Sequence, residues 1–387
     1  MFIFRLLLKN AFRHRLRTLL TLIGLVVAIS SFGLLRTIVH AWYAGVEASS
    51  SVRLVTRSAT SLTFPLPLSY AERIRSVEGV SGVSWANWFG GVYVTERNFF
   101  AQFAVDGASY FKLYPEFVMP EADQQAFLRD LQGAVVGRKL ANRFGWKVGD
   151  TIALRGTIYP GTWRFTVRAI YQGRDQKTDE QQMFIHWKRL SEQIRARQGA
   201  GLQADQVGVY VVRVHDPDEA SSVSLRIDAL FRNSLAETYT ETEKAFQLGF
   251  VSMSEAILVA VQAVSFIIIL IIMAVMANTM TMTARERLAE YATLKALGFP
   301  PSFVVKLLLG ESLFIAGMGG ALGVAITFPL AQMFKQAVGT LFPIFYVSPT
   351  TVLMQVAACG VVGVVAAAWP AWKMSRIDIV QGLRHVA

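Results

Sequence analysis

The stretch TARERLAEYATLKALGFPP, residues Thr283–Pro301, is a charged island between long apolar runs. The 28 residues Ala256–Thr283 carry no charge, and neither do the 23 residues Ser312–Phe334 beyond the island. Runs of this length and composition are typical of membrane-spanning helices. Gly298 and the two prolines after Phe299 are typical of a helix end. The stretch therefore predicts a short charged helix between two membrane spans.

Composition agrees with a membrane protein, since 53% of the 387 residues are hydrophobic and only 17% are charged. The net charge of +11 first suggests a nucleic-acid partner. However, residues 41–250 carry 24 Lys and Arg against 22 Asp and Glu, whereas the rest of the chain carries 14 against 5. The excess flanks the apolar runs, as the positive-inside rule expects. The expected partner is therefore the lipid bilayer, and no nucleic acid is expected.

The fold class predicted is an α-helical membrane protein with four transmembrane helices and an α+β domain inserted between spans one and two. Positive charge places both termini inside and the long segment outside. In chain order we expect a cytoplasmic basic amphipathic helix (1–18), span one (19–40), the outside domain (41–250), a stalk with span two (251–283), the inside helix (284–302), span three (303–334), a short outside loop (335–349), span four (350–372) and a cytoplasmic tail (373–387). A flank that only sets topology is the alternative for residues 1–18.

The outside domain mixes strand and helix patterns, and a division into two subdomains near Phe111–Gln132 stays open. Residues Glu237–Met253 have helical character, so we expect one long helix to continue from there into span two. The lone cysteine, Cys359, lies in an apolar run, which excludes an intrachain disulfide. The expected strands are Gly91–Val94, Phe100–Val105, Thr151–Leu154, Arg164–Tyr171 and Val207–Val214, and the expected helices are Ser69–Ser76, Lys139–Phe144 and Ser221–Phe231, the last of them begun by Asp216-Pro217.

The inside helix carries two like charges one turn apart, at Glu286 and Glu290. Such a pair destabilises an isolated helix by about 0.2–0.5 kcal/mol. A helix that keeps this pair beside exposed Leu294 and Leu297 fits a partner with basic groups around an apolar socket. The alternative is a solvated connector whose apolar side rests on lipid.

Small residues in the last two spans predict close helix contacts, at Gly319 and Gly323 and at Gly360 and Gly363. For Glu311, a gate or an ion-pair partner is one hypothesis, and we favour the other, an interfacial residue near the inner surface. Asn278 and Thr279 are expected to make helix contacts or to lie at the interface. Trp85, Trp88 and Phe89 form either an exposed patch or core, and we favour core.

Enzyme motifs are missing from the sequence. No G-x-x-x-x-G-K-S/T motif occurs, because Gly133–Lys139 has the wrong spacing and lacks the Lys-Ser/Thr pair. The five histidines are scattered without metal-ligand spacing, and no nucleophile elbow is present. We therefore expect no catalytic residues, no cofactor and no metal.

Several stretches resemble MacB/FtsX-type ABC transporter permeases. TARERLAEYATLKALGF is similar to the family segment E-R-x-x-E-I-x-x-L-K/R-A-L/I/M-G after span two. Lys9–Leu25 is similar to the basic entry into span one. Trp369–Arg384 resembles the closing motif, with Ile379 where the family usually has proline and Gly382 where it usually has Ala or Ser. Ala134–Leu154 resembles the strand-helix-V-G-D segment of the MacB-like periplasmic core domain.

The resemblance implies a multi-pass permease of the bacterial inner membrane, with a periplasmic domain and both termini cytoplasmic. The implied partners are two copies of a separate cytoplasmic ABC ATPase and a second permease copy or a paralogue. A periplasmic adaptor or a hydrolase is a further candidate. The inside helix becomes the coupling helix that docks on the ATPase, and the residues matched to this role are Glu286, Arg287, Glu290, Leu294, Lys295, Leu297 and Gly298.

The function expected is mechanotransmission: ATP-driven motion becomes a periplasmic conformational change that exports a hydrophobic, lipid-linked or peptide-like substrate. An FtsX-like signalling subunit that controls a periplasmic partner such as a cell-wall hydrolase is the alternative. A membrane-anchored enzyme is disfavoured, since an anchor needs one span and not four.

Overall fold

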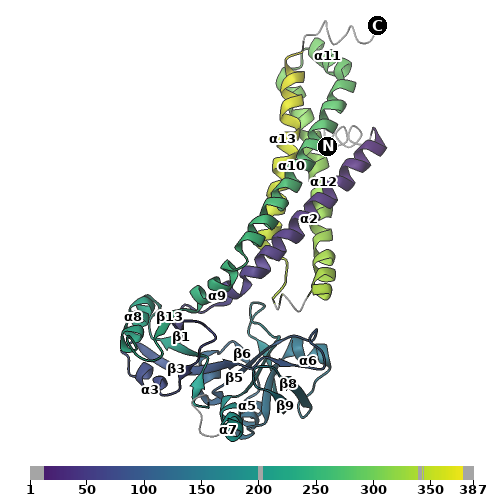
Figure 1. The fold of residues 1–387 in the computed structure, drawn as a ribbon. Coiled ribbons are helices and arrows are strands. Elements are labelled where there is room, and N and C mark those ends of the chain that lie inside the picture. Colours follow the sequence, from purple (N-terminus) through teal and green to yellow (C-terminus); the bar gives the residue numbers. More distant parts are fainter. Residues whose placement is uncertain (1–12, 199–203, 339–341, 343, 378–387) are drawn as a thin grey trace. The chain divides into compact units, whose positions relative to one another are not determined.

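The computed structural model describes residues 13–198, 204–338, 342 and 344–377, which fold into two compact units (Figure 1). One unit comprises Met1–Trp42, Ser254–Gly339 and Phe345–Ala387, and the other comprises Tyr43–Met253 and Thr340–Ile344. The amphipathic helix expected over residues 1–18 lies mostly outside the described residues, and so does most of the expected cytoplasmic tail.

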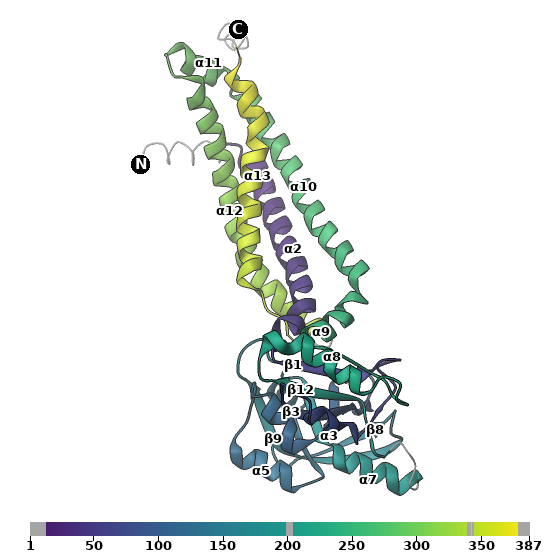
Figure 2. The same ribbon diagram turned by 90° about the vertical axis from the view of Figure 1, so that its left-hand side faces the viewer.

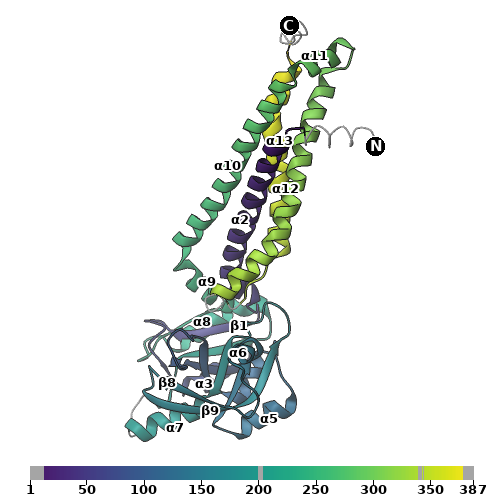
Figure 3. The same ribbon diagram turned by 90° about the vertical axis from the view of Figure 1, so that its right-hand side faces the viewer.

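The first unit is helical, and four of its described helices are long and apolar enough to cross a membrane. Figures 2 and 3 show these helices side by side, with the short α11 at the end of the bundle where α13 also ends. The helices are α2 (Arg15–Ala48), α10 (Glu255–Glu286), α11 (Leu288–Ala296), α12 (Pro301–Val338) and α13 (Pro349–Ser375).

Glycines let the helices of this unit approach closely. A Cβ atom built on Gly319 would lie 2.7 Å from the Cβ of Leu25, and one on Gly323 would lie 2.8 Å from the Cβ of Ile29, so α12 meets α2 along these positions. A Cβ on Gly363 would lie 2.9 Å from a methyl carbon of Leu313, where α13 meets α12. A Cβ on Gly360 would meet no described atom within 4 Å.

The expected continuous helix from Glu237 into span two is wrong. Residues Thr238–Thr242 form strand β13, whose β-branched threonines favour a strand. Helix α9 (Glu243–Ser252) follows, begun by the Thr242 hydroxyl, which accepts from the amide of Ala245. A turn at residues 253–254 then separates α9 from α10.

The second unit is an α+β domain built on one eleven-stranded sheet of the described residues, in the order β13-β1-β12-β3-β5-β10-β7-β9-β8-β4, with β6 paired to β9. The two strands β11 and β2 pair separately. The strands are β1 (Arg53–Ser58), β2 (Leu66–Pro67), β3 (Val80–Trp88), β4 (Gly91–Val92), β5 (Ala101–Val105), β6 (Phe117–Val118), β7 (Gly133–Gly137), β8 (Thr151–Gly156), β9 (Gly161–Gly173), β10 (Gln182–His186), β11 (Gln206–Val207), β12 (Val209–Val214) and β13. The helical segments are α3 (Tyr70–Arg75), α4 (Gly107–Leu113), α5 (Glu121–Arg129), α6 (Arg138–Phe144), α7 (Trp187–Gln198), the 3-10 turn η1 (Pro217–Glu219), α8 (Ala220–Leu230) and α9.

Alternating side chains bury both faces of this sheet. On β12, Tyr210 and Val212 belong to the core cluster that includes Ile74 and Val223, whereas Val211 belongs to the cluster that includes Phe127. Strands that precede residues 111–132 in the sequence and strands that follow them belong to this one sheet, although a subdomain division was considered there.

The aromatic group Trp85, Trp88 and Phe89 divides between core and surface. Phe89 is fully buried and Trp85 packs against the core, as the favoured interpretation expected. Trp88 is 40% exposed and lies beside exposed Phe99, so the core interpretation is wrong for this residue.

Candidate functional site

Most of the charged island forms an elbow, residues Thr283–Phe299, which comprises the last turn of α10, the short helix α11 and the turn before α12. Arg287 interrupts the helix with φ −104° and ψ 17°, so α11 starts as a separate short helix at Leu288. At its other end Gly298 adopts φ +91°, the left-handed region that glycine enters freely. The amide of Phe299 then donates to the carbonyl oxygen of Leu294 at 3.1 Å, and the helix stops as the sequence pattern predicts.

The two like-charged carboxylates of the elbow are neutralised by basic residues at the start of α2 and in the turn just before it. Arg17 donates to both carboxylate oxygens of Glu286, at 2.9 and 2.6 Å, in the bidentate geometry that gives strong ion pairs. His14 lies 3.3 Å from the same carboxylate, and Arg13 donates to Glu290. The cations expected from a partner are therefore supplied within the chain, which the sequence pattern did not predict.

Arg287 joins the elbow to α12 inside the protein. Its guanidinium donates to Glu290 and to Glu311, each at 2.9 Å, and stands 5.2 Å from the centre of the Tyr291 ring. The side chain of Glu311 is only 2% exposed and that of Arg287 8%. The ion-pair partner that was one hypothesis for Glu311 is therefore observed.

Lys295 ties the elbow to α13. Its ammonium donates to the carbonyl oxygens of Ser375 and Ile377, at 2.7 and 2.9 Å, where helix α13 ends. The last carbonyl groups of a helix lack partners within the helix and favour a cation. Through these contacts one short segment is bonded to α2, α12 and α13.

Thr279 on α10 makes a weaker contact with α2. Its hydroxyl lies 3.4 Å from that of Thr21 on α2, one turn beyond Arg17. This helix contact is the one expected for Thr279.

Two family models match the chain, and one of them includes the elbow. The FtsX-like permease C-terminal model matches residues 263–379, which include the elbow, and the MacB-like periplasmic core domain model matches residues 18–230, more than half of the chain. The chain belongs to the MacB/FtsX-type family of ABC transporter permeases.

Individual relatives of the permease match over different lengths. The uncharacterized ABC transporter permease MJ1507 of Methanocaldococcus jannaschii is 22% identical over 400 residues, which cover 97% of this chain and 96% of that protein. The ABC transporter permease YtrF of Bacillus subtilis is 28% identical over 121 residues, or 28% of each chain. The macrolide export ATP-binding/permease protein MacB of Shewanella oneidensis is 32% identical over 106 residues, which are 27% of this chain and 16% of MacB. The chain thus spans under a third of YtrF and of MacB.

One solved structure, the extracellular domain of the ABC-type transporter YknZ from Gram-positive bacteria, also matches the permease. Its TM-score is 0.36 at 11% identity, and the match covers 49% of this chain and 100% of that chain.

Electrostatics keep the permease's elbow charged. Burial alone would raise the pKa of Glu290, but the hydrogen bonds from Arg13 and Arg287 outweigh it and hold the pKa below its ordinary value. Burial would also lower the pKa of Arg287, yet Tyr291 and the two carboxylates raise it. Both ions therefore stay charged near neutral pH.

The apolar residues of the permease's elbow divide into a buried and an exposed set. Tyr291 and Ala292 are buried, and Leu294 is half-buried against the same helical core, so its predicted exposure is wrong. Leu297 is 71% exposed, and Phe299 is 42% exposed beside the ring of Phe303.

We call Leu297, Gly298 and Phe299 the tip. The sequence argument missed Phe299, although its position just after the helix-ending glycine could have indicated it. Among the described residues no cluster of three metal-ligating side chains occurs.

Proposed function

We propose that this permease couples to a separate cytoplasmic ABC ATPase through the tip, and that the elbow passes the ATP-driven motion to the other membrane helices. The observation that supports the proposal best is the arrangement of the elbow's contacts. Its charged side chains are bonded to α2, α12 and α13, while its tip stays exposed and apolar. A segment that is bonded to three membrane helices and exposes an apolar tip to a partner can transmit motion of the partner to those helices.

The ionic contacts suit transmission for a physical reason. Arg287 and Glu311 form a buried ion pair, and separating the two partners of such a pair is costly. Movement of α11 therefore displaces α12 with it and does not leave Glu311 unpaired. The bidentate pair of Arg17 and Glu286 links the elbow to α2 in the same way, so that α2 also moves when the elbow moves.

Hydrolysis itself is assigned to the partner, since these 387 residues contain no P-loop motif. The coupling helix lies on the cytoplasmic side of a bacterial inner membrane in this proposal, and the α+β domain is periplasmic. The work exports a hydrophobic, lipid-linked or peptide-like substrate. Two permease copies, or one with a paralogue, pair with two ATPases, and the uncovered backbone at Gly360 supports such pairing of helices.

A charge placed on the tip tests the coupling. Leu297→Asp puts a carboxylate on an exposed apolar contact, and Leu225→Asp is a matched control because Leu225 on α8 is 72% exposed. Tagged permease is purified from membranes of its own host, and vanadate-sensitive ATP hydrolysis in the eluate is measured. We expect Leu297→Asp to lower this activity about tenfold or more, because a buried unpaired charge at an interface costs several kcal/mol.

The control should retain the activity at the wild-type level. Equal ATP hydrolysis in the Leu297→Asp and wild-type eluates, at equal amounts of permease, would remove the tip from the coupling role. Transport is separated from signalling by reconstituting the complex in vesicles and asking whether ATP turnover depletes a labelled lipid-linked or peptide substrate from the outer side.

A further inference from the structure

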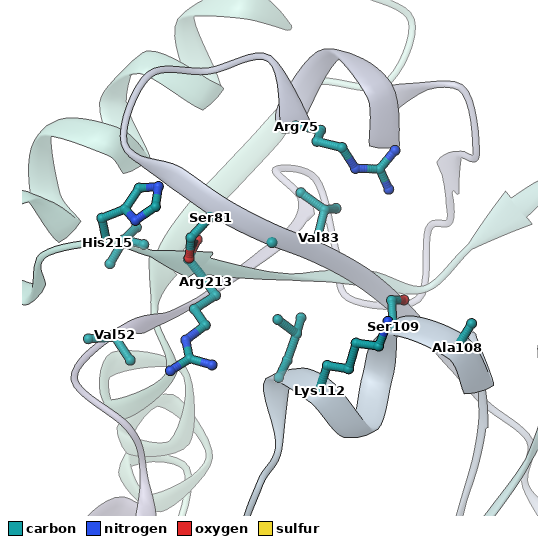
Figure 4. Close-up of a pocket in the computed structure, with 12 residues that line it drawn as sticks. Val52, Arg75, Ser81, Val83, Ala108, Ser109, Lys112, Arg213 and His215 are labelled. Atoms are coloured by element: carbon teal, nitrogen blue, oxygen red, sulfur yellow. Dashed lines mark hydrogen bonds between the residues drawn. The ribbon is translucent and has the colours of Figure 1, made fainter. Parts of the chain in front are cut away.

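A groove of ≈ 600 Å³ in the α+β domain gathers basic side chains and contains no acidic one. Lys112 on α4, Arg213 on β12 and His215 just after β12 supply basic groups, and Arg75 on α3 adds a guanidinium that is already paired with Glu72. Figure 4 shows Arg213 and Lys112 below the β3 ribbon and Arg75 above it. This concentration is local, because residues 41–250 as a whole are close to neutral.

Two features of β3 create the groove. The β3–β12 register shifts between Val80↔Val214 and Gly82↔Arg213, so Ser81 is an extra residue that forms a bulge. Gly82 has no side chain, and a Cβ there would come within 2.9 Å of Leu113 on α4. The bulge and the missing side chain hollow the surface directly beside Arg213.

The edge of β3 keeps the groove open. Its pairing with β5 begins only at Ala86, whereas its pairing with β12 extends back to Val80. Among the described strands, the first half of β3 therefore has a neighbour on one side only. Arg75 on α3 and Lys112 on α4 also line the groove.

Two cations of the groove, Arg213 and Lys112, lack the ion pairs that other cations of this domain have. Arg53 stands opposite Arg213 in the β1–β12 register, and its guanidinium is bonded to Glu116 and Glu243. For Arg213 and Lys112 the described residues offer no carboxylate within ion-pair distance. An anion bound in the groove would supply the negative partner that these cations lack.

We propose that this groove binds a phosphate group, carried either on a lipid headgroup or on a small soluble molecule. The guanidinium of Arg213 presents the planar donor set that matches phosphate oxygens, and Lys112 adds a mobile point charge. The walls also include Val52, Val83 and Leu113, which suit an apolar portion next to the phosphate. The site is independent of the elbow and of ATPase coupling.

Calorimetric titration of the full-length permease in a neutral detergent tests the site. The probes are inorganic phosphate, glycerol 3-phosphate, short-chain phosphatidylglycerol and a hexaglutamate peptide. The variant Arg213→Gln/Lys112→Gln removes both cations, and Arg164→Gln/Lys188→Gln is the control, since these exposed cations of the same domain do not line the groove.

The groove variant should bind the phosphate probes about tenfold more weakly or worse, because hydrogen bonds between charged groups are the strong ones. The control should stay within about twofold, since exposed charges contribute little. The single variant Lys112→Gln should also weaken phosphate binding, and because Lys112 is exposed this substitution should leave the domain folded.

Tighter binding of phosphatidylglycerol than of glycerol 3-phosphate supports a lipid headgroup, and equal binding supports a soluble phosphate. Three results would overturn the proposal: no saturable phosphate binding by the wild type, the same affinity in the groove variant, or hexaglutamate bound more tightly than every phosphate probe.

Discussion

The buried ion pair between Arg287 and Glu311 gives the sharpest stability prediction. Removing one partner of a buried pair costs about 3–5 kcal/mol, because the other charge stays buried without compensation. The two single changes should differ. In Glu311→Leu, Arg287 keeps its 2.9 Å bond to Glu290, so the loss falls at the lower end of that range.

In Arg287→Met, Glu311 loses the only hydrogen-bond partner that the described residues give it, and Glu290 loses a partner as well. The cation over the Tyr291 ring is also lost, a contact that contributes about 0.5–2 kcal/mol. We therefore expect Arg287→Met to be the more destabilising single change. The double variant Arg287→Met/Glu311→Leu should regain much of the stability, since no charge is then left unpaired at Glu311.

Equilibrium unfolding of the purified permease in mixed detergent micelles measures these differences. Arg13→Gln is the control, because the Arg13–Glu290 pair is about half exposed on both sides and such pairs contribute about 0–1 kcal/mol. The reasoning is refuted if Arg287→Met unfolds within about 1 kcal/mol of the wild type, or if the double variant is as unstable as the sum of the singles.

Two further predictions concern packing and pH. Gly323→Leu should destabilise the helical unit by about 1–3 kcal/mol because its side chain would enter the space of Ile29, whereas Gly317→Leu on the same helix should be tolerated, with both measured by unfolding in micelles. The lowered pKa of Glu290 predicts a stabilisation that is present above its unfolded-state pKa of about 4.3 and is lost as the pH falls through its folded-state pKa. Glu290→Gln should remove this part of the pH dependence, and an unchanged unfolding profile between about pH 5 and 3 in that variant would contradict it.

The membrane spans could be predicted because their signal is local. A run of uncharged residues long enough to cross the bilayer specifies a helix without reference to the rest of the chain, and Gly298 ends α11 by its own conformation. The strand over residues 238–242 was missed for the opposite reason. Its pairing with β1 joins residues nearly two hundred positions apart, which local helical character does not reveal.

The ionic contacts of the elbow could not be predicted from spacing along the helix. Glu286 and Glu290 look like an uncompensated pair when only their own helix is considered. Their partners Arg17 and Arg13 lie more than 260 residues away in the sequence. The buried ion pair of Glu311 could not be predicted from spacing for the same reason, since its cation comes from another element.

Charge reversal across the α2 contact tests transmission through the elbow most directly. In the permease–ATPase complex purified from its host, hydrogen exchange of the α+β domain is measured with and without ATP and vanadate. We predict an ATP-dependent change in the wild type, its loss in Arg17→Glu and in Glu286→Arg, and its return in the double reversal, which restores the pair observed at 2.6 Å. If both single-reversal variants keep the same ATP-dependent change in hydrogen exchange as the wild type, the claim that the elbow drives α2 through this pair is contradicted.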